Sequence, residues 1–209
     1  MLASARSFVH DPRSMKIGRV TLIDPVVAVK QKNLDIEVEK TVAKIFLEPS
    51  EFVTRHVANE PKAIKAALVE LCDKEKCPLV LTFGGVGPAL TEIVPDITLE
   101  IVDRKIPGLG EMMRMLSYDR AKVSILSRAE GGVRGTSLIV NLPTRPKPIK
   151  FCFKILQEPI AEALEQLSGA KPGLRGDEIE VPVDKYLPFL KKLRPKPEPG
   201  GPKHPIIGE

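Results

Sequence analysis

Residues 81–96 read LTFGGVGPALTEIVPD, an apolar strand end followed by three glycines within four positions. The glycines, Gly84, Gly85 and Gly87, tolerate positive φ angles and let backbone N–H groups approach an anion closely. Their spacing matches neither the P-loop motif nor the GxGxxG motif of dinucleotide-binding folds. The stretch therefore predicts either a phosphate-binding loop or a tight turn from a strand into a helix.

The residues on both sides of this loop alternate between strand patterns and helix patterns. Short apolar, β-branched runs predict strands, and apolar residues three and four positions apart predict helices. Strands are expected at residues 16–23, 52–57, 79–82, 123–126 and 138–142, and helices at 34–47, 61–76, 96–104, 108–118 and from 149 onward. Pro159 is expected to kink or split the last helix, because proline removes a hydrogen-bond donor. This alternation favours an α/β fold with a parallel sheet covered by helices.

The composition suits one soluble domain with terminal extensions. The chain has 209 residues, 43% of them hydrophobic, and it contains no apolar run long enough to span a membrane. The formal charge is +5, but the basic residues do not form one block, so nucleic-acid binding is not expected. The three cysteines include no CxxC pair, which argues against a disulfide framework and favours the reducing cytoplasm.

Three regions are expected along the chain. Residues 1–14 lack the apolar stretch of a secretory signal and are predicted to be a flexible leader. Residues 15–168 contain the folded domain. Residues 169–209 are a Pro-rich C-terminal extension, since eight of the twenty prolines lie between Pro172 and Pro205. Apolar residues between Ile179 and Leu193 are expected to dock part of this extension on the domain.

Two carboxylates, Glu92 and Asp96, follow the glycine loop. A carboxylate beside a phosphate repels it unless a divalent cation lies between them, and Mg²⁺ commonly bridges carboxylates and phosphates. Both residues are therefore candidate metal ligands. The alternatives are a helix N-cap for Asp96 and a solvated loop carboxylate for Glu92.

Two further polar loops are expected at the same edge of the sheet. Residues 141–146 follow one predicted strand and include Arg145, and residues 126–128 follow another. In α/β proteins ligands bind beyond the carboxyl ends of the strands. The three loops are therefore expected to converge on one anionic ligand.

Four separate motifs lie along the chain in a fixed order: residues 81–96, residues 107–114 (PGLGEMMR), residues 125–128 (ILSR) and residues 133–143 (VRGTSLIVNLP). They are similar to the motifs LTTGGTGPxxxDxTPD, PGFGExMR, LSR and IRG…LIINLPG of the Mog/gephyrin G-domain family. The order and spacing agree from about residue 15 to residue 167. The resemblance implies a three-layer α/β/α sandwich with a mostly parallel sheet, assembled as a homotrimer.

The resemblance also implies a role in molybdenum cofactor biosynthesis, as a molybdopterin adenylyltransferase. In that reaction the terminal phosphate of molybdopterin attacks the α-phosphate of Mg·ATP, which gives adenylylated molybdopterin and pyrophosphate. ATP and molybdopterin would be the substrates, Mg²⁺ the cofactor, and a downstream molybdenum-insertion protein a further partner. The protein would mainly position the reactants and neutralise their charge.

The family motifs assign roles to individual positions. Catalytic roles fall on Glu92, Asn59 and Asp24, and metal binding falls on Glu92 and Asp96. Binding of molybdopterin or its phosphate falls on Thr82, Gly84, Gly85, Gly87, Pro88, Ser127, Arg128, Asn141, Pro143 and Thr144.

Several positions depart from the family pattern. Phe83 and Val86 replace threonines of the glycine loop, and Glu92 replaces an aspartate. Asn59 replaces the aspartate at the start of the second helix, and Thr144 replaces the glycine after NLP. These changes keep the backbone donors but remove hydroxyl groups and one carboxylate. The alternative function is therefore a catalytically impaired protein of this fold that binds molybdopterin or acts as a trimeric scaffold.

Overall fold

Strand and helix alternate along most of the chain in the computed structural model, which describes residues 14–23, 28–169 and 171–175. The elements are β1 (Met15–Leu22), α1 (Ala28–Ile45), β2 (Ser50–Val57), α2 (Pro61–Val69), the π-helical turn η1 (Glu70–Lys74), β3 (Leu79–Phe83), α3 (Val94–Ile101), β4 (Arg104–Lys105), α4 (Pro107–Tyr118), the 3₁₀ turn η2 (Lys122–Leu126), β5 (Gly131–Arg134), β6 (Ser137–Leu142) and α5 (Pro146–Ser168). None of the helices in the described part of the chain combines the length and apolar composition that a bilayer crossing requires.

Six strands form one mostly parallel sheet in the order β2-β1-β3-β6-β5-β4. The first four strands in this order run parallel to one another, with Ile17 of β1 opposite Leu79 of β3, and Leu79 opposite Leu138 of β6. Strands β5 and β4 extend the sheet in antiparallel pairing. The carboxyl ends of four parallel strands therefore lie at one edge, which is where α/β proteins bind ligands.

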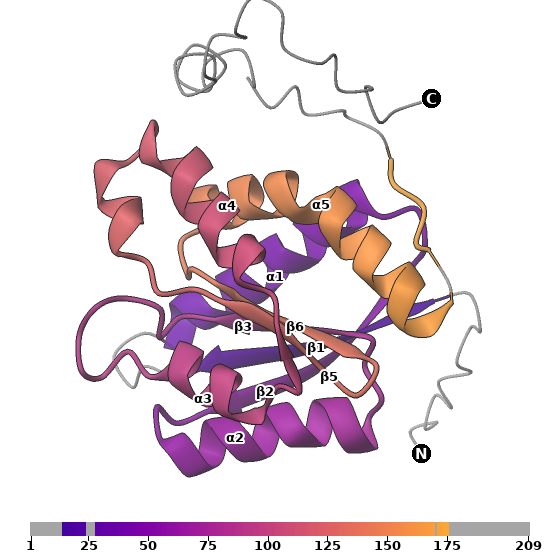
Figure 1. Cartoon of the computed structure of the whole chain (residues 1–209), viewed down its shortest axis with the longest axis horizontal. Helices are drawn as coiled ribbons and strands as arrows, with labels where there is room; N and C mark the ends of the chain where they lie inside the picture. The colour runs from indigo at the N-terminus through magenta and orange to yellow at the C-terminus, as the bar shows by residue number, and fades with distance from the viewer. Residues whose placement is uncertain (1–13, 24–27, 170, 176–209) are drawn as a thin grey trace, which may run out of the picture. The chain divides into compact units, whose positions relative to one another are not determined.

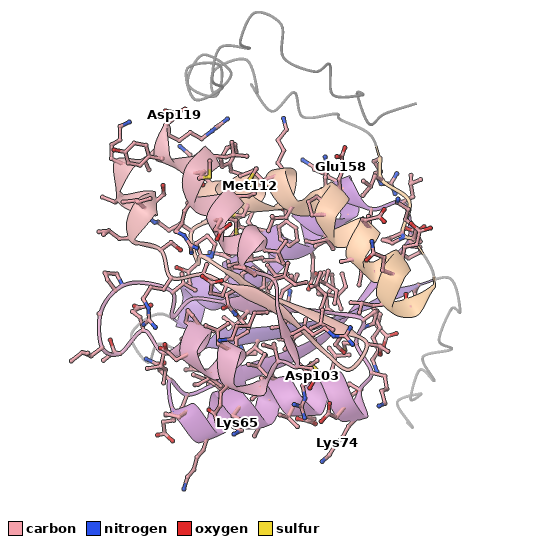
Figure 2. The ribbon with its side chains drawn as sticks, in the orientation of Figure 1. Lys65, Lys74, Asp103, Met112, Asp119 and Glu158 are labelled. Carbon is pink, nitrogen blue, oxygen red and sulfur yellow. The ribbon has the colours of Figure 1, made fainter. Side chains whose placement is uncertain are left out.

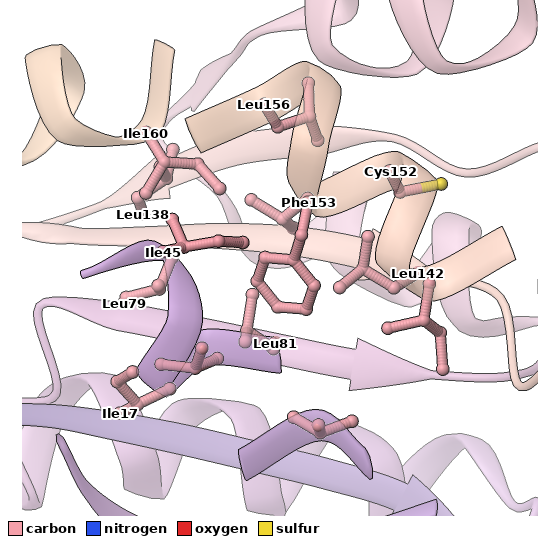
Figure 3. Close-up of a cluster of buried hydrophobic side chains, with 14 of the residues drawn as sticks. Ile17, Ile45, Leu79, Leu81, Leu138, Leu142, Cys152, Phe153, Leu156 and Ile160 are labelled. Carbon is pink, nitrogen blue, oxygen red and sulfur yellow. The ribbon is translucent and has the colours of Figure 1, made fainter. Parts of the chain in front are cut away.

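Helices cover both faces of the sheet, with α1, α4 and α5 on one face and α2 and α3 on the other (Figure 1). Leu79 and Leu81 of β3 pack against Phe153 of α5 in the first core cluster (Figure 3). Val80, between them in sequence, belongs to the second cluster together with Leu68 of α2. Successive side chains of a strand point to opposite faces, so this alternation builds the two cores. The predicted three-layer α/β/α sandwich is confirmed.

One expected strand is wrong, and two strands were not expected. Residues 123–126 lie in the 3₁₀ turn η2, and Val123, Ile125 and Leu126 are more than half exposed. A four-residue apolar run cannot by itself distinguish a buried strand from an apolar surface turn. The short strands β4 and β5 escaped prediction because their charged and glycine residues are typical of loops.

Helix α5 continues through Pro159 without being split. Pro159 is exposed, so its ring does not disturb the packed face of the helix. Buried residues on both sides of it, including Leu156 and Ile160, pack on the core and hold the two halves in one helix. Packing of the apolar face thus outweighs the missing hydrogen bond.

The start of the C-terminal extension contacts the end of α1. The backbone N–H of Leu47 donates to the carbonyl of Gly173 at 2.8 Å. The Arg175 guanidinium donates to the carbonyls of Ala43 and Phe46 at 2.9 and 3.0 Å. The Arg175 bonds satisfy carbonyl groups that the end of a helix leaves without partners. Residues 1–13 of the expected leader and residues 176–209 of the extension, including the apolar residues expected to dock, lie outside the described residues.

Candidate functional site

Three loops meet at the carboxyl edge of the parallel strands, although residues 126–128 follow the 3₁₀ turn η2 and not the expected strand. The loop between β3 and α3 contains the three glycines. The backbone N–H of Gly84 donates to the carbonyl of Leu142 at the end of β6, at 3.0 Å. The backbone N–H of Arg128 donates to the carbonyl of Val86 at 2.7 Å. Residues more than forty positions apart in sequence thus contact the same glycine loop.

Two glycines of this loop adopt a left-handed backbone. Gly84 has a φ of 97° and Gly85 a φ of 67°. A Cβ atom on Gly85 would lie 2.4 Å from Cγ2 of Val94, so no larger residue fits. Within the described part of the chain the N–H groups of Gly85 and Val86 have no hydrogen-bond acceptor. A turn with such unpaired backbone donors can bind an anion.

Glu92 folds back on the loop that precedes it. Its Oε2 atom accepts a hydrogen bond from the backbone N–H of Gly87 at 3.1 Å. Its backbone carbonyl accepts one from Nη1 of Arg128 at 3.1 Å. The side chain is half-buried, so this carboxylate lies inside the site and is not the fully solvated loop group of the alternative interpretation.

Asp96 forms an ion pair with Arg128, whose Nη2 atom donates to Oδ1. The residue lies in the first turn of α3, and Ile93 is the N-cap. The N-cap interpretation of Asp96 is therefore wrong, because the helix begins two residues earlier than expected. A negative charge in the first turn still interacts favourably with the helix dipole.

Thr82 and Asn141 lie beneath the site, with 1% and 0% of their surface exposed. The Asn141 amide donates to Oγ1 of Thr82 at 3.0 Å and to Oγ1 of Thr98 at 2.9 Å. Its Oδ1 atom accepts from the backbone N–H of Glu130 at 3.3 Å. Both residues were expected to bind phosphate, but their side chains instead join β3, α3 and β6 below the ligand-binding edge.

The residues that differ from the family motifs also differ in their burial. Phe83 is fully buried in the core, and Val86 is half-buried against the same core, so neither side chain is displayed at the loop surface. Asn59 is exposed after β2 and donates to the carbonyl of Thr91 at 2.9 Å. Thr144 is exposed, and its Cγ2 atom lies 2.9 Å from the position of a Cβ on Gly84.

The remaining predicted residues lie around this edge or outside the described part. Pro88 is exposed and Pro143 half-buried, in the loops after β3 and β6. Ser127 precedes Arg128, and its Oγ atom accepts from the backbone N–H of Ala129 at 3.3 Å. Asp24 lies outside the described residues, so its position is not part of the site described above.

Sequence reasoning gave no role to Arg114, although it closes the PGLGEMMR motif. The Arg114 guanidinium donates to the carbonyls of Ser127 and Ala129 at 3.2 and 2.9 Å and pairs with Glu130 at 3.2 Å. It therefore fixes the segment that carries Arg128. The motif itself was the signal, but its partners lie 13 to 16 positions away in sequence.

The comparisons with known proteins agree with this geometry. A family model described as a probable molybdopterin binding domain matches residues 48–163. The molybdopterin adenylyltransferase of Escherichia coli K12 is 39% identical over 138 residues, which cover 66% of this chain and 71% of that protein. The molybdopterin adenylyltransferase of Helicobacter pylori 26695 is 38% identical over 132 residues, covering 63% and 75%.

Solved structures also share the fold. The molybdopterin biosynthesis enzyme MoaB of Thermus thermophilus superposes with a TM-score of 0.65 at 31% identity, covering 75% of this chain and 98% of that chain. The Mog protein of Mycobacterium ulcerans gives a TM-score of 0.62 at 25% identity, covering 74% and 98%. The described glycine loop lies inside the matched region, and more than half of the chain is covered. The chain therefore belongs to the family of probable molybdopterin binding domains.

Proposed function

We propose that this protein is a molybdopterin adenylyltransferase of molybdenum cofactor biosynthesis, which transfers AMP from ATP to the phosphate of molybdopterin. The observation behind the proposal is that the end of β6 and the segment after η2 both contact the glycine loop that carries Gly84, Gly85 and Gly87, within a chain whose curated relatives are named for this activity. The enzyme is a nucleotidyltransferase that gives adenylylated molybdopterin and pyrophosphate.

The chain's own groups fit the anionic reactants. The N–H groups of Gly85 and Val86 and the guanidinium of Arg128 are the donors available to a phosphate at the loop. Charge-assisted bonds from arginine to phosphate are about twice as strong as neutral ones. The pterin side of the site would be shaped by residues of the same loops, namely Pro88, Ser127, Pro143 and Thr144. Thr82 and Asn141 support the loop from below.

The proposed reaction uses Mg²⁺, and Glu92 is the residue proposed to bind it. No group of three or more His, Cys, Asp or Glu side chains that could hold a metal exists in the described part of the chain. Mg²⁺ in phosphate-transfer sites is usually held by one or two carboxylates together with substrate phosphates, so the half-buried Glu92 fits this requirement. When bound, the ion would neutralise the charge on the phosphates of ATP. Glu92 and Asn59 would orient the nucleotide, and the family motifs give the same role to Asp24, which lies outside the described residues.

The homotrimer is also part of the proposal, and an exposed apolar surface of α4 and η2 supports it. This α4–η2 surface consists of Met112, Met115, Tyr118, Val123, Ile125 and Leu126, which are 39% to 64% exposed. Figure 2 labels Met112 on α4. Exposed apolar side chains gathered on adjoining elements are typical of protein–protein contacts. A molybdenum-insertion protein would be the downstream partner.

A cytoplasmic location completes the proposal. Burial raises the pKa of the Cys72 thiol to about 11 and those of Cys77 and Cys152 to about 12. All three cysteines are free and buried, as expected for packing residues of a protein from a reducing compartment.

The decisive experiment incubates the protein with molybdopterin, ATP and Mg²⁺ and follows both pyrophosphate release and adenylylated molybdopterin. The wild-type protein should form both products in equal amounts. Glu100→Gln is a control that should retain the activity, because Glu100 of α3 forms an exposed ion pair with Lys65 of α2. Molybdopterin binding without pyrophosphate release would instead identify the catalytically impaired protein, and the enzyme proposal would fail.

A further inference from the structure

Arg128 is held at three points around the glycine loop. Its backbone N–H donates to the carbonyl of Val86, its Nη1 atom to the carbonyl of Glu92, and its Nη2 atom to the carboxylate of Asp96. The side chain crosses from the segment after η2 to the first turn of α3. One arginine thus connects the glycine loop to two other elements of the site.

The guanidinium still has donors to offer. An arginine side chain carries five N–H donors in a planar fork. Only two of those of Arg128 have acceptors within the described residues, and 40% of the side chain is exposed. An anchored arginine loses less conformational entropy on binding a ligand than a freely moving one. Asp96 and Glu92 therefore hold Arg128 in place while leaving part of its fork for an anion.

The same contacts disfavour a metal ion at Asp96. The negative charge of its carboxylate is already balanced by the guanidinium of Arg128. A divalent cation placed on this carboxylate would be repelled by the guanidinium a few ångströms away. The Glu92 carboxylate, in contrast, is bonded to the neutral backbone N–H of Gly87. The two carboxylates that follow the glycine loop therefore have different electrostatic surroundings.

We infer that Asp96 is a positioning residue and not a metal ligand: it orients Arg128 toward the phosphate of the anionic substrate. Arg128 also donates to the backbone carbonyl of Glu92, a contact that does not involve the Asp96 carboxylate. The inference rests on the proposed function for the identity of the substrate, molybdopterin. The contacts of Arg128 themselves do not depend on it.

The test compares Asp96→Asn, Asp96→Glu, Arg128→Gln and the double variant Asp96→Asn/Arg128→Gln. Asp73→Asn is the control, because Asp73 also pairs with an arginine, Arg134, away from the glycine loop, through two hydrogen bonds where Asp96 has one. Each protein is assayed for kcat, for the KM of molybdopterin and for the Mg²⁺ concentration that gives half of the maximal rate. Calorimetric titration with molybdopterin and, separately, with inorganic pyrophosphate provides a readout that does not require turnover.

Asp96→Asn should raise the molybdopterin KM about fivefold, the upper range for losing an exposed ion pair, with the Mg²⁺ requirement unchanged within about twofold. Asp96→Glu should recover most of the loss. The double variant should bind no worse than Arg128→Gln alone, because both changes remove one interaction. Asp73→Asn should leave all three quantities at the wild-type values.

Two results would overturn the inference. One is a large increase in the Mg²⁺ requirement of Asp96→Asn, roughly tenfold or more, since removing a coordinating carboxylate takes away one of the few charges that hold the ion. The other is unchanged anion binding in Asp96→Asn, or no binding of either anion by the wild-type protein. If the wild-type protein binds molybdopterin but transfers no AMP, the proposed function fails while the calorimetric comparison still decides the role of Asp96.

Discussion

The backbone N–H of Gly87 donates to Oε2 of Glu92 at 3.1 Å, so the acidic side chain of the glycine loop lies against the backbone of the same loop. Cγ of Glu92 is only 3.3 Å from the position that a Cβ on Gly87 would take. The carboxylate therefore accepts the hydrogen bond of a backbone N–H group in the loop that is proposed to bind phosphate. A phosphate arriving without a cation would meet its negative charge.

Glu92→Gln should separate the two effects of this carboxylate. Without Mg²⁺, pyrophosphate should bind several-fold more tightly, because removing one charge at about 4 Å in a solvated site changes the energy by about 1 kcal/mol. With Mg²⁺ and ATP, AMP transfer should fall about a hundredfold, since the nucleotide is no longer held correctly. Calorimetry and product analysis measure the two quantities. Identical metal dependence in the variant and the wild type would exclude Glu92 as a ligand.

Asn59→Asp should lower the Mg²⁺ concentration needed for half-maximal activity by about threefold, through the added charge beside the carboxylate-bearing loop. The hydrogen bond from the side-chain amide of Asn59 to the carbonyl of Thr91 is lost in this variant. Asn59→Ala loses the same bond without adding charge and is therefore the control. If both variants respond alike to Mg²⁺, the charge at this position has no role in metal binding.

Gly85→Ala should destabilise the protein far more than Gly135→Ala. Both glycines have positive φ, 67° and 56°, and an alanine in this conformation costs about 1–2 kcal/mol. Only at Gly85 would the added Cβ collide with a neighbour, Val94, whereas nothing lies within 4 Å at Gly135. Urea denaturation of both variants gives the difference. Equal losses of unfolding free energy would show that the loop can relax around Val94.

Asn141→Leu should lower the free energy of unfolding by about 3 kcal/mol, because it leaves two buried threonine hydroxyls and a backbone N–H without their partner. Gln166→Leu replaces an amide of the exposed surface of α5 and should change stability by less than about 0.5 kcal/mol. Thermal and urea denaturation provide the comparison. A wild-type stability in Asn141→Leu would mean that water enters and replaces the lost bonds.

Ile125→Asp should disrupt the proposed trimer, since it puts a charge into the α4–η2 surface. The control is Leu90→Asp, because Leu90 is also apolar and is 99% exposed, but it lies outside that surface. Light scattering coupled to size-exclusion chromatography should give the mass of three chains for the wild type and the control, and a lower mass for Ile125→Asp. A trimeric Ile125→Asp protein would place the contact elsewhere.

The sequence predicted those features that depend on neighbouring residues. Apolar runs and their spacing located β1, β2, β3 and β6 and all five helices, to within a few residues except at the start of α1 and at the end of α2, which ends at Val69 and continues as η1. The glycines of residues 81–96 predicted the loop, because only glycine readily adopts the φ angles found at Gly84 and Gly85. Local patterns failed at η2, where side-chain burial depends on the rest of the fold.

By itself, then, the sequence determined the three-layer fold, the position of the glycine loop and the family. Only the tertiary structure decided what each polar residue of the site contacts. Arg128 and Asp96 are 32 positions apart, and Asn141 and Thr82 are 59 apart. Whether a carboxylate meets a guanidinium or an amide meets a hydroxyl depends on how strands and helices pack. Local residue patterns do not predict such distant contacts. For this reason the sequence predicted Asp96 as a metal ligand, whereas the structure shows it paired with Arg128.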